Sequence, residues 1–157
     1  EMEQEFVSTQ KLLDIVPEDR LNFKPHERAM SLGQLAYHVA IIPGRNLNFA
    51  KDGQVEAVVI TEHPEPGSKS DILTIFQGST ESVRSLLTSA DTSWTERNWK
   101  LTHSGTSLAE MPTKAFIRTF VLNHWYHHRG ELTTYLRMLN QKIPSVYGPS
   151  ADVNPFA

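Results

Sequence analysis

Two histidines four positions apart, His124 and His128, are the residues of this chain whose spacing best suits chemistry. On an α-helix, side chains four residues apart point from the same face, so both imidazoles can bind one metal ion. A third histidine, His38, falls in a separate segment with helical spacing. Three imidazoles would leave coordination positions open, and open positions distinguish metal sites that act on a substrate from sites that only stabilise a fold.

The histidines also have a simpler interpretation, as hydrogen-bonded interior side chains or as part of a solvated face. We prefer a metal site because an unpaired buried imidazole costs about 1–3 kcal/mol, and His124 and His128 lie on an apolar stripe. His127 lies about 100° around the helix from His128. It is therefore predicted to be a rim group, and it is the main rival to His128 as a ligand. The other histidines are predicted to be polar surface residues in loops: His26, His63 and His103.

Carboxylates are scarce near these histidines. Trp125 follows His124, so the chain lacks the His-Glu-x-x-His pattern, in which the glutamate of a zinc protease acts as general base. Glu131 is the acidic residue nearest to the pair in the sequence, and three roles are open to it: a fourth metal ligand, an orienting partner of a ligand, or a member of an ion pair. We favour an ion pair with Arg129 or Arg137.

The composition restricts the classes of function. The net charge is −3 and no cluster of lysine and arginine exceeds two neighbours, so binding to nucleic acid is not expected. No apolar run approaches the roughly 18 residues of a membrane span, and the start at Glu1 does not look like a signal peptide. With no cysteine, the chain has no disulfide and no cysteine nucleophile, and any metal must be held by His, Asp or Glu. A cytoplasmic location follows as the expectation.

Four segments with helical spacing are predicted to position the histidines. The first has an apolar stripe from Met2 to Val16 and ends at Pro17, which cannot continue a helix. The second opens with a capping box between Ser31 and Gln34 and carries His38 on its inner face. Within it, the pair Pro43-Gly44 is expected to kink or interrupt the helix.

The third helix is predicted to begin near Ser68, and the fourth to run from about Thr113 to Gln141. Between the second and third helices, residues 51–69 are interpreted as a long connection with a short β-like run from Val55 to Ile60. The part from Gln54 to Pro66 is expected to lie outside the bundle core, and residues 91–112 are interpreted as irregular. These elements predict a single domain over residues 1–157, an all-α four-helix bundle. The third helix should bury Ile72, Phe76, Ser79, Val83, Leu87 and Ala90. The tryptophans are interpreted as core residues, with a pocket wall as the alternative: Trp94, Trp99 and Trp125.

Four stretches of the sequence form a recognisable set of motifs: Ser31–Val39, Asn123–Leu132, Leu136-Arg137 and Pro144–Asp152. Through these residues the chain resembles the DinB-like family of metal-binding four-helix bundles. The resemblance implies an up-down-down-up bundle with a long connection between helices 2 and 3, and frequently a homodimer. It also implies one divalent metal bound by His38, His124 and His128. The family commonly has glutamine where this chain has Glu131.

Some proteins of that family are thiol S-transferases or thiol-dependent isomerases, so the first functional hypothesis is a metal-dependent thiol S-transferase that acts on small electrophiles. Since the chain has no cysteine, the thiol would be a low-molecular-weight cosubstrate such as bacillithiol, mycothiol or glutathione. Zinc, nickel and iron all accept imidazole ligands. Two alternatives stay open: a non-catalytic metal-binding stress-response or sensor module, and a metal-dependent hydrolase. The hydrolase is weaker because no general base stands beside the ligands.

Overall fold

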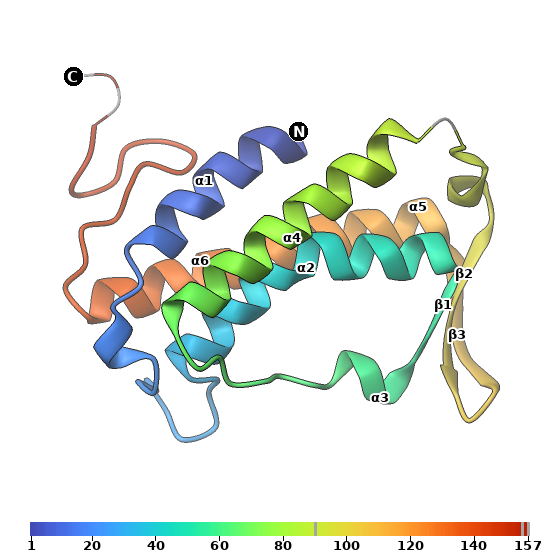
Figure 1. Ribbon diagram of the computed structural model, residues 1–157, viewed down its shortest axis with the longest axis horizontal. Helices are drawn as coiled ribbons and strands as arrows, with labels where there is room; N and C mark the ends of the chain where they lie inside the picture. Colours follow the sequence, from blue (N-terminus) through green and yellow to red (C-terminus); the bar gives the residue numbers. More distant parts are fainter. Residues whose placement is uncertain (90, 155, 157) are drawn as a thin grey trace.

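The computed structural model describes residues 1–89, 91–154 and 156 (Figure 1). Within these residues four long helical segments form the body of the molecule. Helices α2 and α4 run in the same direction, and α1 and the C-terminal helix run in the opposite one (Figure 1). The long segments are α1 (Met2–Asp14), α2 (Leu32–Asp52), α4 (Lys69–Thr88) and a continuous helix made of α5 (Thr113–Phe116), the π-helical segment η3 (Ile117–Asn123) and α6 (His124–Met138).

Shorter elements connect the long helices, and the three strands lie together at the end of the molecule where α2 finishes (Figure 1). They are the helices η1 (Glu18–Arg20), α3 (Ala57–Ile60) and η2 (Ser93–Glu96), and the strands β1 (Gln54–Glu56), β2 (Asn98–His103) and β3 (Thr106–Pro112). Among the described residues, no helix combines the length and the apolar character that crossing a membrane requires.

The starts of α2 and α4 follow from local hydrogen bonds. Ser31 Oγ accepts a hydrogen bond from the backbone N–H of Gln34 at 3.0 Å, and Gln34 Oε1 accepts one from the backbone N–H of Ser31 at 3.0 Å. The predicted capping box is therefore confirmed. Ser68 Oγ accepts a bond from the backbone N–H of Asp71 at 3.1 Å and caps α4 in the same way. These caps fix where the helical periodicity begins, and with it which faces turn inward.

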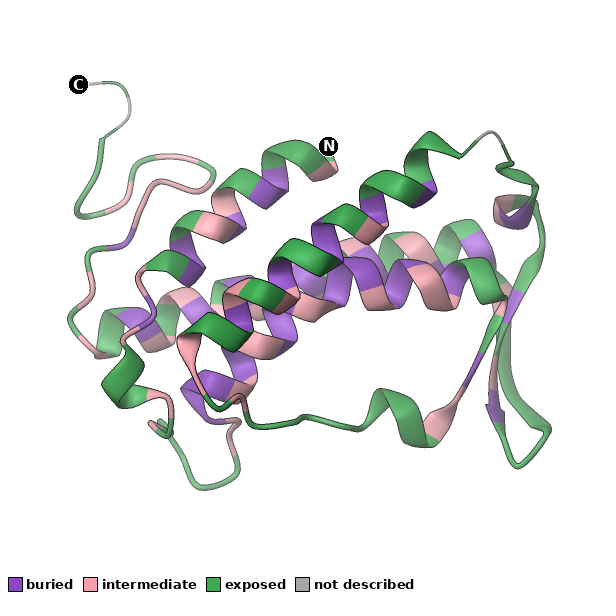
Figure 2. Ribbon diagram, viewed as in Figure 1, coloured by how far each residue is buried: buried purple, intermediate pink, exposed green. Residues whose placement is uncertain are grey.

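The inner faces of the long helices carry the buried side chains (Figure 2). On α4, Ile72, Phe76 and Val83 are buried as predicted, but Leu87 is 57% exposed and Leu86 is buried in its place. Positions three and four residues after Val83 lie on nearly the same face, so the periodicity alone does not separate them. The predicted burial of Ala90 falls outside the described residues.

The prediction of an all-α four-helix bundle is wrong, because the described residues also form a three-stranded mixed sheet. Strands β2 and β3 form an antiparallel hairpin, and β1 pairs in parallel with β2. The hairpin occupies residues that were expected to be irregular. Its two-residue turn, Ser104-Gly105, has φ angles of 48° and 79°, as the tight hairpin turns with two positive φ angles require. Along β2, Trp99 and Thr102 are buried while Lys100 is exposed.

The connection between α2 and α4 contains β1 and α3. It was expected to lie outside the core, with a β-like run from Val55 to Ile60. The strand ends at Glu56, and Val55 is buried in the core with 7% exposure. The chain then returns beside the helices to begin α4 at the end where α2 begins (Figure 1). This return is feasible because extended chain covers about 3.3 Å per residue and a helix about 1.5 Å.

Pro43-Gly44 was expected to kink or interrupt the second helix, and the interruption does not occur, because α2 continues through both residues. A Cβ atom on Gly44 would lie 2.8 Å from the Cα atom of Ser79 in α4. The backbone N–H of Gly44 donates a hydrogen bond of 2.8 Å to Ser79 Oγ. The glycine therefore serves the close approach of α2 and α4 rather than a break in the helix.

Candidate metal centre

His38 from α2 meets His124 and His128 from α6 between the two helices. The Nε2 atoms of His38 and His124 are 3.2 Å apart. The ring centroids of His38 and His128 are 4.5 Å apart, and those of His124 and His128 are 4.4 Å apart. One ligand atom from each of the three residues lies within 4.8 Å of the other two. The structure thus brings together the three histidines selected from the sequence.

The spacing of these nitrogens suits two ligands of a single metal ion. Bonds between a metal and an imidazole nitrogen measure about 2.0–2.1 Å. With such bonds, the 3.2 Å between the Nε2 atoms of His38 and His124 corresponds to an angle of about 100° at the metal. This angle falls between octahedral and tetrahedral values, so the pair fits either geometry.

Burial keeps the three imidazoles uncharged at neutral pH. It lowers the pKa of His38 to about 2, with the neighbouring histidines adding to the effect. It also lowers the pKa of His124 to about 4. The pKa of His128 is lowered by burial too, although the nearby carboxylate of Glu131 acts in the opposite direction. Since a metal binds the neutral ring, protons do not compete for these nitrogens near pH 7.

Glu131 contacts histidines instead of forming the expected ion pair with an arginine. Its Oε2 lies 2.6 Å from Nδ1 of His128, and its Oε1 lies 3.4 Å from Nε2 of His127. The N–H at Nδ1 of His128 can donate a hydrogen bond to this carboxylate, which leaves the lone pair of Nε2 free for a metal. Of the three roles left open for Glu131, the geometry favours the orienting partner.

The two arginines that were expected to pair with Glu131 bind other carboxylates. Arg129 is 2% exposed, and its Nη2 lies 2.6 Å from Oε2 of Glu5 in α1. Arg137 pairs with Asp152 in the C-terminal segment. The predicted ion pair is therefore wrong. Arg129 instead joins α6 to α1, and Arg137 joins α6 to the C-terminal segment that follows it.

Two further histidines, His127 and His63, lie next to the three central histidines. The side chain of His127 is 65% exposed and turns toward Glu131, in agreement with its predicted place on the rim. His63 is exposed as predicted, but its ring centroid lies 4.9 Å from that of His38. The backbone carbonyl of His63 accepts a hydrogen bond of 2.9 Å from Nε2 of Gln34, which fixes the connection beside the site. His63 was missed because only the path of this connection brings it there.

A cavity of about 220 Å³ opens beside His124, between α2, the segment η3 and the sheet. Its polar side chains are those of Arg45, Asn46 and His124. Trp99 belongs to its wall, whereas Trp125 is fully buried in the core. The sequence did not predict this cavity because it did not predict the sheet. Apolar side chains form most of the wall: Phe49, Trp99, Leu101, Met111, Phe116 and Phe120.

The helix that carries His124 is π-helical directly before this residue, from Ile117 to Asn123. Within this segment, the carbonyl of Phe120 accepts a hydrogen bond of 2.7 Å from Nδ2 of Asn46 in α2. The wider π-helical turn changes the direction of the side chains that follow it, and such turns are frequent at functional sites. A regular helical period does not reveal this feature.

A helical body that holds three histidines between α2 and α6 is the arrangement that the DinB resemblance implied. A family model described as the DinB family matches residues 2–153, and the chain belongs to this family. It is 25% identical to the uncharacterized protein YrdA of Bacillus subtilis over 149 residues, which cover 92% of this chain and 83% of YrdA.

Solved structures of DinB-like proteins share the fold. A protein from Bacillus cereus has a TM-score of 0.70 and 24% identity, with 93% of each chain covered. The Bacillus subtilis protein YjoA has a TM-score of 0.67 and 21% identity, with 90% of this chain and 91% of YjoA covered. The family model thus confirms the predicted family, and the solved structures show that the fold is shared.

Proposed function

We propose that the chain binds one divalent transition metal through His38, His124 and His128 and acts as a thiol S-transferase on small electrophiles. The observation that carries the proposal is a group of three neutral imidazoles with a cavity beside one of them. A structural metal site is normally closed by four protein ligands. Three histidines beside a cavity instead leave room for reactants, and membership in the DinB family supports the same choice.

When bound, the metal would act as a Lewis acid that lowers the pKa of a thiol, so that the thiolate exists at neutral pH. The protein would keep the three rings neutral by burial, orient His128 through Glu131 and hold the electrophile in the cavity. Since the chain has no cysteine, the thiol is a cosubstrate such as bacillithiol, mycothiol or glutathione. Zinc, nickel and iron all accept imidazole ligands.

A non-catalytic metal-binding stress-response or sensor module is the second candidate. The observation that favours it is the 4% exposure of His38, because a metal held at so buried a ring would also stabilise the packing of α2 against α6. A hydrolase is less well supported. It needs a free general base, and both oxygens of Glu131 lie close to histidines.

The proposal extends to a cytoplasmic homodimer with a small-molecule substrate. The dimer is supported by the resemblance to the family, and the cytoplasm by the absence of cysteine. Sedimentation equilibrium of the untagged chain measures the mass directly. A monomer at micromolar concentration would remove the dimer from the proposal and leave the metal site in place.

Metal content of the untagged protein tests the site. We expect about one divalent metal per chain in the wild type, loss of that metal in His124→Ala and retention in His127→Ala, the matched control one helical position from His128. Equal traces of metal in the wild type and His124→Ala would show that the site does not exist. Loss in His127→Ala alone would show that the ligand set is wrong.

Thiol consumption tests the reaction. The metal-loaded protein is mixed with each of the three thiols and a panel of small electrophiles, and the remaining free thiol is measured over time. Turnover that disappears in His38→Ala, while circular dichroism shows an intact fold, supports the transferase. Absence of turnover with every thiol, together with a large fall in thermal stability on chelation, selects the non-catalytic module.

A further inference from the structure

The apolar wall of the cavity suits a flat ring. The rings of Trp99 and Phe116 are stacked with centroids 4.0 Å apart, and the rings of Phe116 and Phe120 are 5.2 Å apart. A cavity of about 150 Å³ can hold benzene, so the 220 Å³ beside His124 accommodates a ring with a small substituent. The apolar body of the ligand would therefore lie against these aromatic side chains.

Most polar groups in the wall already have partners. Nε1 of Trp99 donates a hydrogen bond of 2.9 Å to the carbonyl of Phe49. Nδ2 of Asn46 donates one of 2.7 Å to the carbonyl of Phe120, and Oδ1 of Asn46 accepts one of 3.2 Å from Nε of Arg45. These bonds use Nε of Arg45 and leave its two terminal nitrogens as donors for a ligand.

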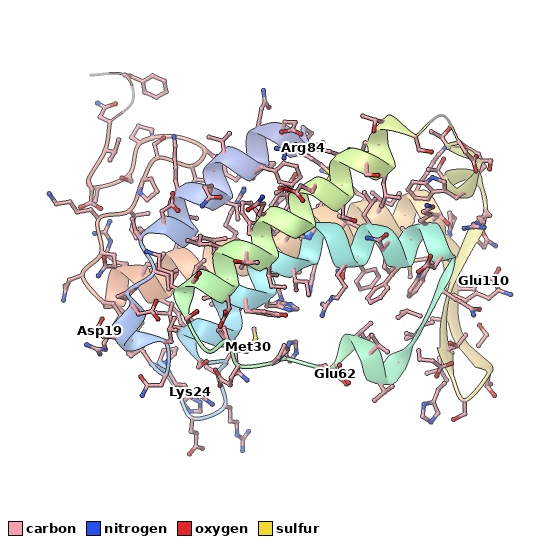
Figure 3. All side chains as sticks on the ribbon, in the orientation of Figure 1. Asp19, Lys24, Met30, Glu62, Arg84 and Glu110 are labelled. Atoms are coloured by element: carbon pink, nitrogen blue, oxygen red, sulfur yellow. The ribbon has the colours of Figure 1, made fainter. Side chains whose placement is uncertain are left out.

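Arg45 is a half-buried cation without a carboxylate partner among the described residues. By contrast, Arg84, Arg129 and Arg137 each form an ion pair. The guanidinium carbon of Arg45 lies 5.9 Å from the ring centroid of Phe49. Glu62, on the connection that follows α3 (Figure 3), contributes charge near Arg45 but does not pair with it.

A guanidinium that is partly removed from water gains most from an anion that matches its planar donors. The cavity wall therefore combines a cation, Arg45, with aromatic side chains and the ring of His124. A polar thiol such as glutathione would gain little from such a wall. An apolar electrophile that carries a carboxylate fits both the charge and the wall.

We propose that the cavity beside His124 binds the electrophilic substrate, that this substrate is a small organic anion with a ring-sized apolar body, and that Arg45 pairs with its anionic group. That this ligand is a substrate rests on the proposed function. The binding preference itself does not depend on turnover, so it can be measured on its own.

Phenylacetate and its neutral amide, phenylacetamide, serve as probes of equal shape and different charge. Isothermal titration calorimetry on the full-length protein should give at least roughly tenfold tighter binding of the anion, which is about 1.4 kcal/mol. In Arg45→Gln the two probes should bind with nearly equal affinity. Arg118→Gln is the matched control, because Arg118 lies in η3 with its side chain 62% exposed. It should keep the wild-type preference.

A second pair of variants tests the cavity without touching Arg45. Ala109 lines the cavity from the exposed strand β3, and Ala109→Trp should abolish binding of both probes. Its neighbour Leu108 is 57% exposed and does not belong to the wall, so Leu108→Trp should bind both normally. Unchanged binding in Ala109→Trp would place the ligand elsewhere and overturn the proposal.

The metal content of each sample separates this proposal from the proposed function. If Arg45→Gln keeps the preference for the anion, the carboxylate is recognised by another group, such as a bound metal, and the proposal is overturned. Equal affinities in the wild type, or no binding of either probe, also overturn it, whatever the metal content. Competition by glutathione would assign the cavity to the thiol and contradict the assignment to the electrophile. A chain that shows the Arg45-dependent preference without metal would refute only the proposed function.

Discussion

Glu131 is the residue through which α6 fixes the ring of His128. The 2.6 Å contact with Nδ1 selects the tautomer whose Nε2 can bind a metal, and the negative charge increases the basicity of the ring. A glutamine would keep an acceptor oxygen in the same place without the charge. An alanine would remove the acceptor altogether.

We therefore expect Glu131→Ala to weaken metal binding by roughly 10–100-fold, the usual effect of losing a partner of a ligand histidine. Glu131→Gln should retain most of the affinity. Competition with a chelator of known affinity measures both variants. Glu110→Ala is the control, since Glu110 points away from the helices (Figure 3) and pairs with Lys100 on the sheet. Wild-type affinity in Glu131→Ala would show that the contact does not serve the site.

Among single residues, the sequence predicts those features that depend on neighbouring positions in the chain. His124 and His128 share a helix face by geometry alone, and the apolar pattern around His38 adds the third ring. The partners of the charged residues were not predictable in this way. Arg129 and Glu5 are 124 positions apart, and no pattern near Arg129 indicates that its carboxylate comes from another helix. The same is true of the place of His63 beside His38.

Among the elements, the contact between α2 and α4 depends on Gly44. A methyl group there would lie 2.8 Å from Cα of Ser79, and backbone cannot move as a side chain does. Gly78 is the matched control, because a Cβ at this exposed position in α4 meets no other described atom within 4 Å.

Gly44→Ala should therefore lower the free energy of unfolding by about 1–3 kcal/mol, the usual cost of overpacking. Gly78→Ala should raise it by about 0.5–1 kcal/mol, because alanine favours helix more than glycine does. Urea denaturation at pH 7 measures both values. If the two variants shifted stability in the same direction, the close approach of α2 and α4 would be contradicted.

The helices were predictable and the sheet was missed for related reasons. Caps such as that of Ser31 and long stripes of apolar residues are local signals. The strands are short, and β1 pairs with a strand whose residues lie 46 positions further along the chain. The turn Ser104-Gly105 between alternating residues was a usable hairpin signal that the helical interpretation overlooked. The cavity could not be predicted without the sheet, because Trp99 and Ala109 of its wall lie on the strands β2 and β3.

For the whole molecule, the buried imidazoles of the candidate metal site make the stability of the protein depend on pH. Burial lowers the pKa of His38 to about 2 and that of His124 to about 4 in the folded protein, against 6.5 for an ordinary histidine. In the metal-free state, the unfolded chain therefore takes up these protons below pH 6.5 while the folded chain does not. Above pH 6.5 the two rings are neutral in both states, and the unfolding free energy keeps its full value. As the pH falls toward the folded pKa values, the unfolding free energy decreases progressively.

We expect the unfolding free energy of the metal-free protein to fall by about 1.4 kcal/mol per pH unit for each ring well below pH 6.5. Urea titrations between pH 7 and pH 5 measure this slope, in a range where most carboxylates stay ionised. A variant with both His38→Gln and His124→Gln should show a shallower slope, whereas His103→Gln, at an exposed position, should keep that of the wild type. An equal slope in the double variant would mean that neither ring resists protonation in the folded state.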